Sequence, residues 1–331
     1  MMTENIIEWL LEEENPSIRY ITLTSLLGRS RTEQEVIGAR MAIMQHGLVP
    51  EILSGQNDDG SWGISEKFYT QKYTGTVWVL LLLAELEVDP DDPRVRKACE
   101  FILTHSQEPE AGGFSYMQSL KTGTGLSSGV IPCLTGNMVY SLIKLGCLDD
   151  SRVQKAIEWI TKYQRADDGM EHLPEFAMYK HYEMCWGYHS CHMGVAKALK
   201  ALAAIPPEKR SSETDNKIAE LTEYFLMHHL YKKSHNLNEI SRPGWLKPGF
   251  PLMYQTDILE LLGIFADLSI TDSRLNDAIE IIRSKELPDG RWKMENSNNG
   301  KMIVRVEKKG MPSKWITCKS LRVLEKYPKI T

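Results

Sequence analysis

The chain has 331 residues, with 39 Lys+Arg against 44 Asp+Glu and a formal net charge of −5 with His neutral. This mildly acidic, charge-mixed composition argues against a dedicated nucleic-acid binder, which would carry a basic excess. The longest mostly apolar run, Val77 to Leu86, which is interrupted only by Glu85, is far shorter than the roughly 18 residues that a membrane span needs. The N-terminus lacks the features of a signal peptide, and six cysteines are too few for a disulfide scaffold. We therefore expect a soluble, cytoplasmic protein with no transmembrane segment.

Amphipathic helices with aspartate caps recur along the chain. Asp92, Asp150 and Asp272 each precede a segment whose apolar residues fall on one helical face. An aspartate oxygen at this position can accept a hydrogen bond from the first helical turn. Because only one face is apolar, these helices should cover the outside of a core. We expect such outer helices near residues 4–13, 33–47, 93–106, 151–164, 213–229 and 273–285.

A second class of helix follows each outer helix, after a glycine-containing turn and a polar connector. Four of its starts share a register, at Gly75, Gly136, Gly194 and Asp257, which stand 61, 58 and 63 residues apart. These helices are apolar around most of their circumference, which places them between other elements. Inner helices are expected to begin near residues 17, 74, 135, 192, 255 and 313.

The two ends of the chain resemble each other. Pro16-Ser17, at the start of the first inner helix, is matched by Pro312-Ser313 at the start of the last. Proline is favourable in a first helical turn, and serine can cap it. Six helical hairpins with similar first and last members favour a closed ring, and an open α-solenoid is the alternative.

The turns that precede the inner helices carry a spaced motif. Gln56, Gly60 and Trp62 follow the pattern Gln-x-x-x-Gly-x-Trp, and degenerate copies begin at Gln107, Gln164 and Lys285. The pattern resembles the squalene-cyclase-like repeat of the terpenoid-cyclase and protein-prenyltransferase superfamily. This resemblance covers essentially the whole chain and implies an all-α single domain over residues 1–331, an α6/α6 toroid of six helical hairpin repeats. It also implies an apolar central cavity, of the kind often used for isoprenoid chains.

The segment Asp89-Pro90-Asp91-Asp92 resembles the Asp-x-Asp-Asp proton donor of class II cyclases. A carboxylic acid in a dry pocket can protonate an alkene, because burial and like charge keep one proton bound. Here, however, the motif lies in a loop between an inner and an outer helix, and Asp92 occupies the cap position. We therefore expect a surface turn whose aspartates are exposed and remote from the cavity.

Thiols and imidazoles gather just before the fourth inner helix. Cys185, Cys191 and His192 are potential zinc ligands, and Cys133 enters the neighbouring inner helix at nearly the level of Cys191. Because equivalent helix starts converge at one mouth of a toroid, we expect these four residues to form a metal site, with His172 as a further candidate ligand. The zinc motif of protein prenyltransferases has no clean match here. The alternative is that the cysteines are small core residues and the histidines are hydrogen-bonded.

Aromatic residues form a candidate ligand-binding set near the starts of the inner helices. Tyr73, Trp78, Tyr254 and Trp315 would present electron-rich faces that suit isoprenoid chains and carbocations. Ordinary core packing is the alternative reading of the same residues.

The resulting prediction is a prenyltransferase- or terpene-cyclase-like protein that binds an apolar, isoprenoid-like small molecule in a central cavity. The resemblance implies zinc-dependent transfer or cyclisation and, by analogy with prenyltransferase β chains, a helical protein partner. The alternative is a non-catalytic binding or scaffold protein with a structural metal or none. The sequence leaves open whether the protein is an enzyme.

Overall fold

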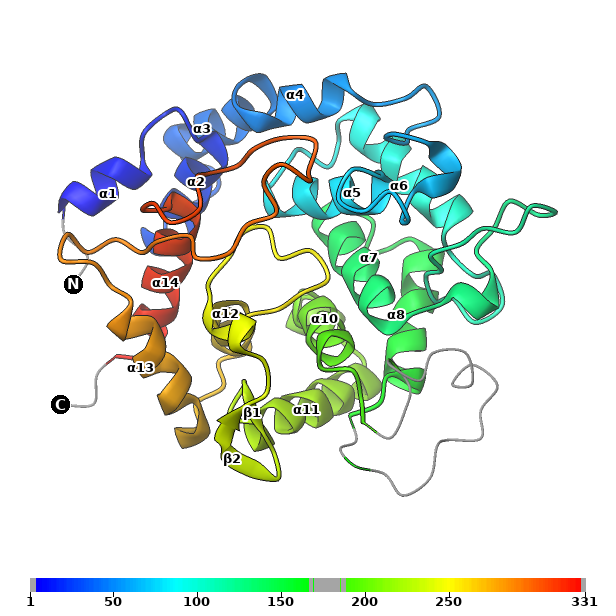
Figure 1. Ribbon diagram of the computed structural model, residues 1–331. Coiled ribbons are helices and arrows are strands. Elements are labelled where there is room, and N and C mark those ends of the chain that lie inside the picture. The colour runs from blue at the N-terminus through cyan, green and yellow to red at the C-terminus, as the bar shows by residue number, and fades with distance from the viewer. Residues whose placement is uncertain (1–3, 167–168, 170–184, 186–188, 329–331) are drawn as a thin grey trace.

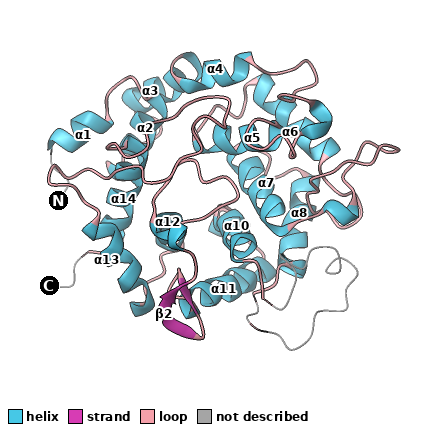
Figure 2. Ribbon diagram, viewed as in Figure 1, coloured by secondary structure: helices cyan, strands magenta, loops and turns pink. Residues whose placement is uncertain are grey.

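The computed structural model describes residues 4–166, 169, 185 and 189–328 of the chain. The helices are arranged as a ring, and the two ends of the chain lie near each other on one side of it (Figure 1). Within the described residues, regular strands are confined to an antiparallel ribbon of β1 (Lys232–Lys233) and β2 (Asn236–Ile240), as Figure 2 shows. The fold is therefore mostly helical, as the sequence predicts.

One set of helices lies around the outside of the ring (Figure 1). These helices are amphipathic: α8, for example, buries Val153, Ile157 and Ile160 while its opposite face is exposed. The outer helices are α1 (Glu4–Leu10), α3 (Gln34–Gln45), α4 (Leu48–Ser54), α6 (Pro93–His105), α8 (Ser151–Tyr163), α11 (Ser212–Met227) and α13 (Asn276–Ser284). Short 3₁₀ turns lie at Ser65–Lys67, Ser127–Gly129, Pro207–Lys209, Pro243–Leu246 and Ser273–Leu275.

A second set of helices forms the inside of the ring. The most apolar of them, α5, buries every residue from Thr76 to Ala84 because other helices surround it. All of them begin within three residues of the predicted starts. The inner helices are α2 (Pro16–Ile21), which continues as a π-helical turn η1 (Thr22–Leu26), α5 (Thr76–Glu85), α7 (Pro132–Lys144), α10 (His192–Ala203), α12 (Ile258–Asp267) and α14 (Lys314–Lys326).

The aspartate caps also join neighbouring outer helices. Asp150 accepts a hydrogen bond from the backbone N–H of Arg152 at 2.8 Å, and the guanidinium of Arg152 returns to the same carboxylate. That guanidinium also donates to both oxygens of Glu100 on α6, at 2.8 Å each. Asp272 and Arg274 repeat the arrangement with a glutamate of α11. At α8, and at the 3₁₀ turn before α13, the cap motif therefore also links the segment to the preceding outer helix.

The Gln-x-x-x-Gly-x-Trp turns hold the helices together through backbone groups. The indole Nε1 of Trp62 donates to the carbonyl of Ile52 at 2.8 Å, and its backbone N–H donates to the hydroxyl of Thr76 at the start of α5. The amide of Gln56 donates to the carbonyls of Gly60 and of Arg94 on α6. Trp292 repeats the tryptophan contacts, with Ile282 and Thr317. The motif is thus a structural tie, as the sequence predicts.

The inner helices contact one another in a closed circuit. Contacts join α5 to α7, α7 to α10, α10 to α12, α12 to α14, and α14 to α2. The hydroxyl of Ser17 on α2 donates to the carbonyl of Leu86, just after α5, at 2.7 Å and completes the circuit. Beyond it, Lys314 pairs with Glu12 at 2.5 Å, so residues from opposite ends of the chain meet. These contacts link the first and last inner helices within the described part of the chain.

Candidate functional site

A cavity of about 330 Å³ lies inside the ring, at the end where the inner helices terminate. Each inner helix contributes to its lining. Glu85, Lys144, Ala203 and Asp267 stand in the last turns of four of these helices, and all four line the cavity. Since their C-terminal ends meet at one cavity, these inner helices run in the same direction, as predicted.

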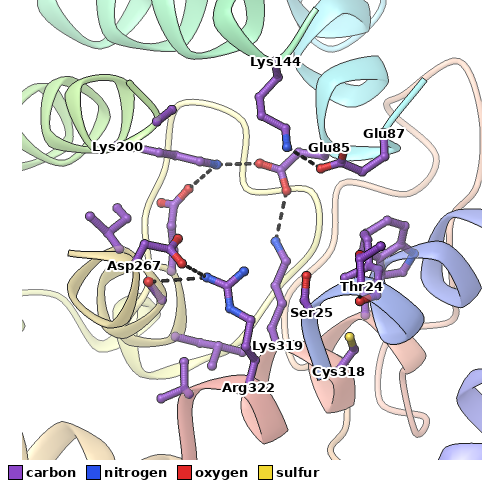
Figure 3. Close-up of a pocket in the computed structure, with 18 of the residues that line it drawn as sticks. Thr24, Ser25, Glu85, Glu87, Lys144, Lys200, Asp267, Cys318, Lys319 and Arg322 are labelled. Atoms are coloured by element: carbon purple, nitrogen blue, oxygen red, sulfur yellow. Dashed lines mark hydrogen bonds and ion pairs between the residues drawn. The ribbon is translucent and has the colours of Figure 1, made fainter. Parts of the chain in front are cut away.

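A chain of ion pairs crosses the floor of the cavity. Lys197 pairs with Glu260 at 2.7 Å, and Glu260 also pairs with Lys200 at 3.0 Å. Lys200 pairs with Glu85 at 2.5 Å, and Glu85 pairs in turn with Lys319 at 3.0 Å. Figure 3 shows Glu85 between the two ammonium groups of Lys200 and Lys319. The side chains of Lys197 and Glu260 are only 1% and 6% exposed, so this end of the chain is removed from solvent.

Further charges surround the opening. Lys144 pairs with Glu87 at 2.5 Å, and Arg322 pairs with Asp267 at 2.6 Å. Arg31 also lines the cavity but is exposed, and it makes no ion pair or hydrogen bond with any other residue that the structure describes. The lining therefore contains paired cations and anions together with one cation that is available at the rim.

Burial and pairing act in opposite directions on the carboxylates of the ion-pair chain. Burial alone would raise the pKa of Glu260, but Lys197 and Lys200 lower it to about 2. The pKa of Glu85 likewise lies well below its usual value, because Lys200 and Lys319 outweigh its burial. Both carboxylates are therefore ionised at neutral pH.

Asp257, at the start of α12, behaves differently. Its carboxylate accepts hydrogen bonds from the backbone N–H groups of Glu260 and Gly249 but contacts no cation among the described residues. Burial raises its pKa to about 6. Asp257 therefore takes up a proton at a higher pH than Glu260 or Glu85 does.

Apolar side chains also line the cavity. Ile18, Leu259, Ile264 and Val323 line it, together with the ring of Trp315. The lining is therefore both charged and apolar, which corrects the apolar cavity expected from the sequence. The charged residues escaped sequence reasoning, although their signal was present: Glu85, Lys200 and Glu260 are charged positions within otherwise apolar inner helices.

The predicted aromatic residues divide between two places. Tyr73 and Tyr254 lie against Trp78, with ring centroids 5.5 and 6.2 Å away. Tyr69, which sequence reasoning missed, packs on Trp78 at 5.0 Å and accepts its indole hydrogen bond through the backbone carbonyl. Trp315 lies elsewhere, stacked on the ring of Phe250 at 3.8 Å. Of the four predicted residues, only Trp315 lines the cavity.

Three of the predicted metal ligands interact with one another. A hydrogen bond with the thiol of Cys185, together with backbone N–H groups at the start of α10, lowers the pKa of Cys191 to about 6. Burial, and then the charge of Cys191, raises the pKa of Cys133 to about 12. Cys133, Cys185 and Cys191 therefore influence one another's pKa.

His192 makes contacts with groups other than the cysteines. Its ring stacks on Trp245 at 4.0 Å, and its Nε2 lies 3.1 Å from the carbonyl of Leu230. His172 lies outside the described residues. In the part of the chain that the structure describes, no group of three or more His, Cys, Asp or Glu residues could hold a metal ion. Zinc stays a prediction, which metal analysis of the purified protein tests.

The acidic triplet forms part of a turn. Asp92 accepts a hydrogen bond from the backbone N–H of Arg94 at 2.8 Å and caps α6. Asp91 is exposed, whereas Asp89 and Asp92 are half-buried. None of the three lines the cavity. The cap assignment is confirmed, and full exposure is found only for Asp91.

Comparisons with known proteins find similarity only among solved structures. No family profile matches the sequence, and no curated protein matches it. The type II terpene cyclase MstE from Scytonema, a variant in complex with geranylgeranyl dihydroxybenzoate, is 15% identical over 95% of this chain and 87% of that chain, with a TM-score of 0.41. The apo form of that enzyme is 14% identical over 94% of this chain and 87% of that chain, with a TM-score of 0.42. A protein from Actinoplanes is 12% identical over 85% of this chain and 97% of that chain, with a TM-score of 0.31. Similarities this distant do not bear on ligand or activity.

Among the described helices, none has the length and apolar character needed to cross a membrane.

Proposed function

We propose that the chain is an α6/α6 toroid that binds a small amphipathic molecule in its central cavity. An isoprenoid-like chain would lie against the apolar wall, and an anionic head group would face the charged rim. The observation that supports this most is the mixed lining, in which Leu259, Ile264 and Val323 line the same cavity as the ion pairs of Glu85. A purely apolar ligand would displace water from these charged groups without replacing its hydrogen bonds, which is costly in a confined site.

The dimensions of the cavity suit such a ligand. Its volume of about 330 Å³ lies at the lower end of the range for small-molecule sites. Burial of apolar ligand surface would contribute about 25 cal/mol per Å². The apolar wall therefore supplies affinity, and the polar groups supply orientation.

The charge balance favours an anionic head group. The lining contains five cationic residues, Arg31, Lys144, Lys200, Lys319 and Arg322, and four acidic ones, Glu85, Glu87, Glu260 and Asp267. The acids are engaged by cations of the ring, whereas Arg31 has no described partner. A guanidinium binds carboxylates and phosphates well, because its donors match their geometry.

The test uses three probes that share one isoprenoid tail: farnesoic acid, farnesol and farnesylamine. Isothermal titration calorimetry should show the anionic probe binding tightest and the cationic probe weakest. Replacing Arg31→Gln should weaken binding of farnesoic acid by about 3- to 5-fold, since an exposed charge contact is worth under about 1 kcal/mol. Farnesol binding should not change.

Arg29→Gln provides the matched control, because Arg29 lies on the same loop but pairs with Glu33 on its own segment. Binding of none of the three probes would refute the proposal. Equal binding of the acid and the amine would retain an apolar site but refute the anionic head group.

A non-catalytic scaffold is the second candidate, and the pairing of the cavity charges favours it. Lys200 and Lys319 both engage Glu85, so the network also stabilises the ring without any ligand. Failure of all probes, together with a stable fold, would favour this role. The helical protein partner that the sequence resemblance implies stays a prediction.

A further inference from the structure

Two cysteines far from the cavity lie side by side on neighbouring hairpins. Cys99 stands on α6 and is 2% exposed, whereas Cys147 follows α7 and is half-buried. Each thiol is the largest influence on the pKa of the other, raising that of Cys99 and lowering that of Cys147. The Cys147 thiol also approaches the carbonyl of Leu145 at 3.7 Å.

Contacts on both sides hold this pair in place. Glu100, next to Cys99, receives two hydrogen bonds from Arg152, which begins the helix after Cys147. Gly146, next to Cys147, has a φ of +80° and packs so closely on Pro90 that an added Cβ would lie 3.1 Å from it. The chain on each side of the two thiols is therefore fixed by contacts that do not involve sulfur.

We propose that Cys99 and Cys147 form a reversible disulfide that staples α6 to the connection between α7 and α8. The oxidant is a small peroxide, for which hydrogen peroxide serves as the probe. Cys147 is the attacking sulfur, because it is reachable from solvent while Cys99 is buried. The neighbouring Cys99 thiol, and to a smaller extent the positive charges of Arg96 and Arg152, lower the pKa of Cys147 and favour its anionic form.

The reaction balances in two steps. The Cys147 thiolate attacks one peroxide oxygen, an S–O bond forms, the O–O bond breaks, and hydroxide leaves as water after it takes up a proton. The Cys99 sulfur then attacks the sulfenic sulfur of Cys147, an S–S bond forms, and the S–O bond breaks. The hydroxide takes the Cys99 proton and leaves as a second water. Two electrons pass from the two thiols to the peroxide.

The disulfide would close a loop of 48 residues, the difference between positions 147 and 99. A cross-link of this span removes conformational freedom from the unfolded chain. For a chain of this length, the melting temperature should rise by about 5 °C.

The experiment uses the full chain with Cys185→Ser and Cys191→Ser, because those two thiols also contact each other. The protein is treated with hydrogen peroxide while folded, alkylated, digested without reduction and mapped by mass spectrometry. The expected product is a peptide that links Cys99 to Cys147, with a higher melting temperature that dithiothreitol reverses.

Cys147→Ser should abolish both the linked peptide and the rise in melting temperature. Cys318→Ser, which removes a buried thiol elsewhere, should abolish neither. Oxidation of Cys147 to the sulfinic acid with Cys99 still alkylatable would overturn the proposal. A linked peptide with an unchanged or lower melting temperature would overturn the role as a staple.

Discussion

At the scale of single residues, Lys197 and Glu260 show how the centre of the ring is held. Both side chains are almost fully buried, and each is neutralised by contacts at 2.7 to 3.0 Å. Burying an isolated charge is very costly, so each residue depends on the other. Lys200 then links the pair to Glu85 and to the cavity wall.

Replacing Glu260→Gln should destabilise the protein strongly. The change leaves the ammonium of Lys197 buried without its carboxylate, and breaking a buried pair from one side costs about 3–5 kcal/mol. Urea unfolding measures the loss. Glu220→Gln, which removes an exposed pair with Lys217 on α11, should cost less than about 1 kcal/mol. Equal losses for the two variants would show that the central network contributes no more than a surface pair.

Stability should also fall at acidic pH, through the same carboxylate. Glu260 has a folded pKa of about 2, below its ordinary value of 4.5. Its stabilising contribution is therefore present above about pH 4.5 and is lost as the pH falls towards 2. Asp257 acts in the opposite sense, since its raised pKa of about 6 favours the protonated folded state as the pH falls through that value.

Melting temperatures between pH 7 and pH 2 test this dependence. The wild type should hold its stability down to about pH 4.5 and then lose it, whereas Glu260→Gln should lose less over the acidic range. Parallel curves for the two proteins would contradict the assignment of the acid-sensitive group.

At the scale of elements, the contact between α7 and α10 depends on one glycine. A Cβ added to Gly136 would lie 2.6 Å from the backbone nitrogen of Ala198, which is closer than real contacts allow. Neither backbone can move easily, because both helices lie inside the ring. Glycine is therefore needed at position 136 because α7 and α10 pack too closely there for a side chain.

Replacing Gly136→Ala should destabilise the protein by about 1–3 kcal/mol or more, as overpacking does. Gly38→Ala on α3 is the matched control, because no atom lies within 4 Å of its added Cβ. That change should stabilise the helix slightly, by up to about 1 kcal/mol. Thermal unfolding compares the two, and a neutral Gly136→Ala would show that the helices can separate without cost.

Substitutions of a capping aspartate and of an exposed aspartate should differ in their effect on the free energy of unfolding. Asp150→Ala removes the cap of α8 and its hydrogen bonds with Arg152, so we expect a loss of about 1–2 kcal/mol. Asp91→Asn changes an exposed turn and should alter the free energy of unfolding by no more than about 0.5 kcal/mol. Loss of ligand binding in Asp91→Asn would reverse the assignment of this loop as a turn.

At the scale of the whole molecule, the ring joins residues that are far apart in the sequence. Ser17 contacts Leu86, and Lys314 contacts Glu12, so the last hairpin packs against the first. Closure brings the C-terminal ends of the inner helices to one cavity. The site therefore belongs to the assembled ring and to no single hairpin.

The helices could be predicted because their signals are local. Asp92 and Asp150 cap their helices through bonds to residues two positions away, and apolar periodicity marks the buried faces. The lining of the cavity could not be predicted in this way, since it depends on which face of each inner helix turns inwards after closure. Successive residues of a helix differ by about 100° in direction, so a small change in rotation alters which side chains face the cavity.

The affinity of a cavity-filling variant tests the central claim most directly. Ala203→Trp would place an indole in the space that we assign to the ligand, whereas Ser54→Trp adds the same group to an exposed position on α4. Titration calorimetry with farnesoic acid should show binding to the wild type and to Ser54→Trp, and at least about 10-fold weaker binding to Ala203→Trp, a loss of about 1.4 kcal/mol. Unchanged affinity in a folded Ala203→Trp protein would place the ligand elsewhere and contradict the account.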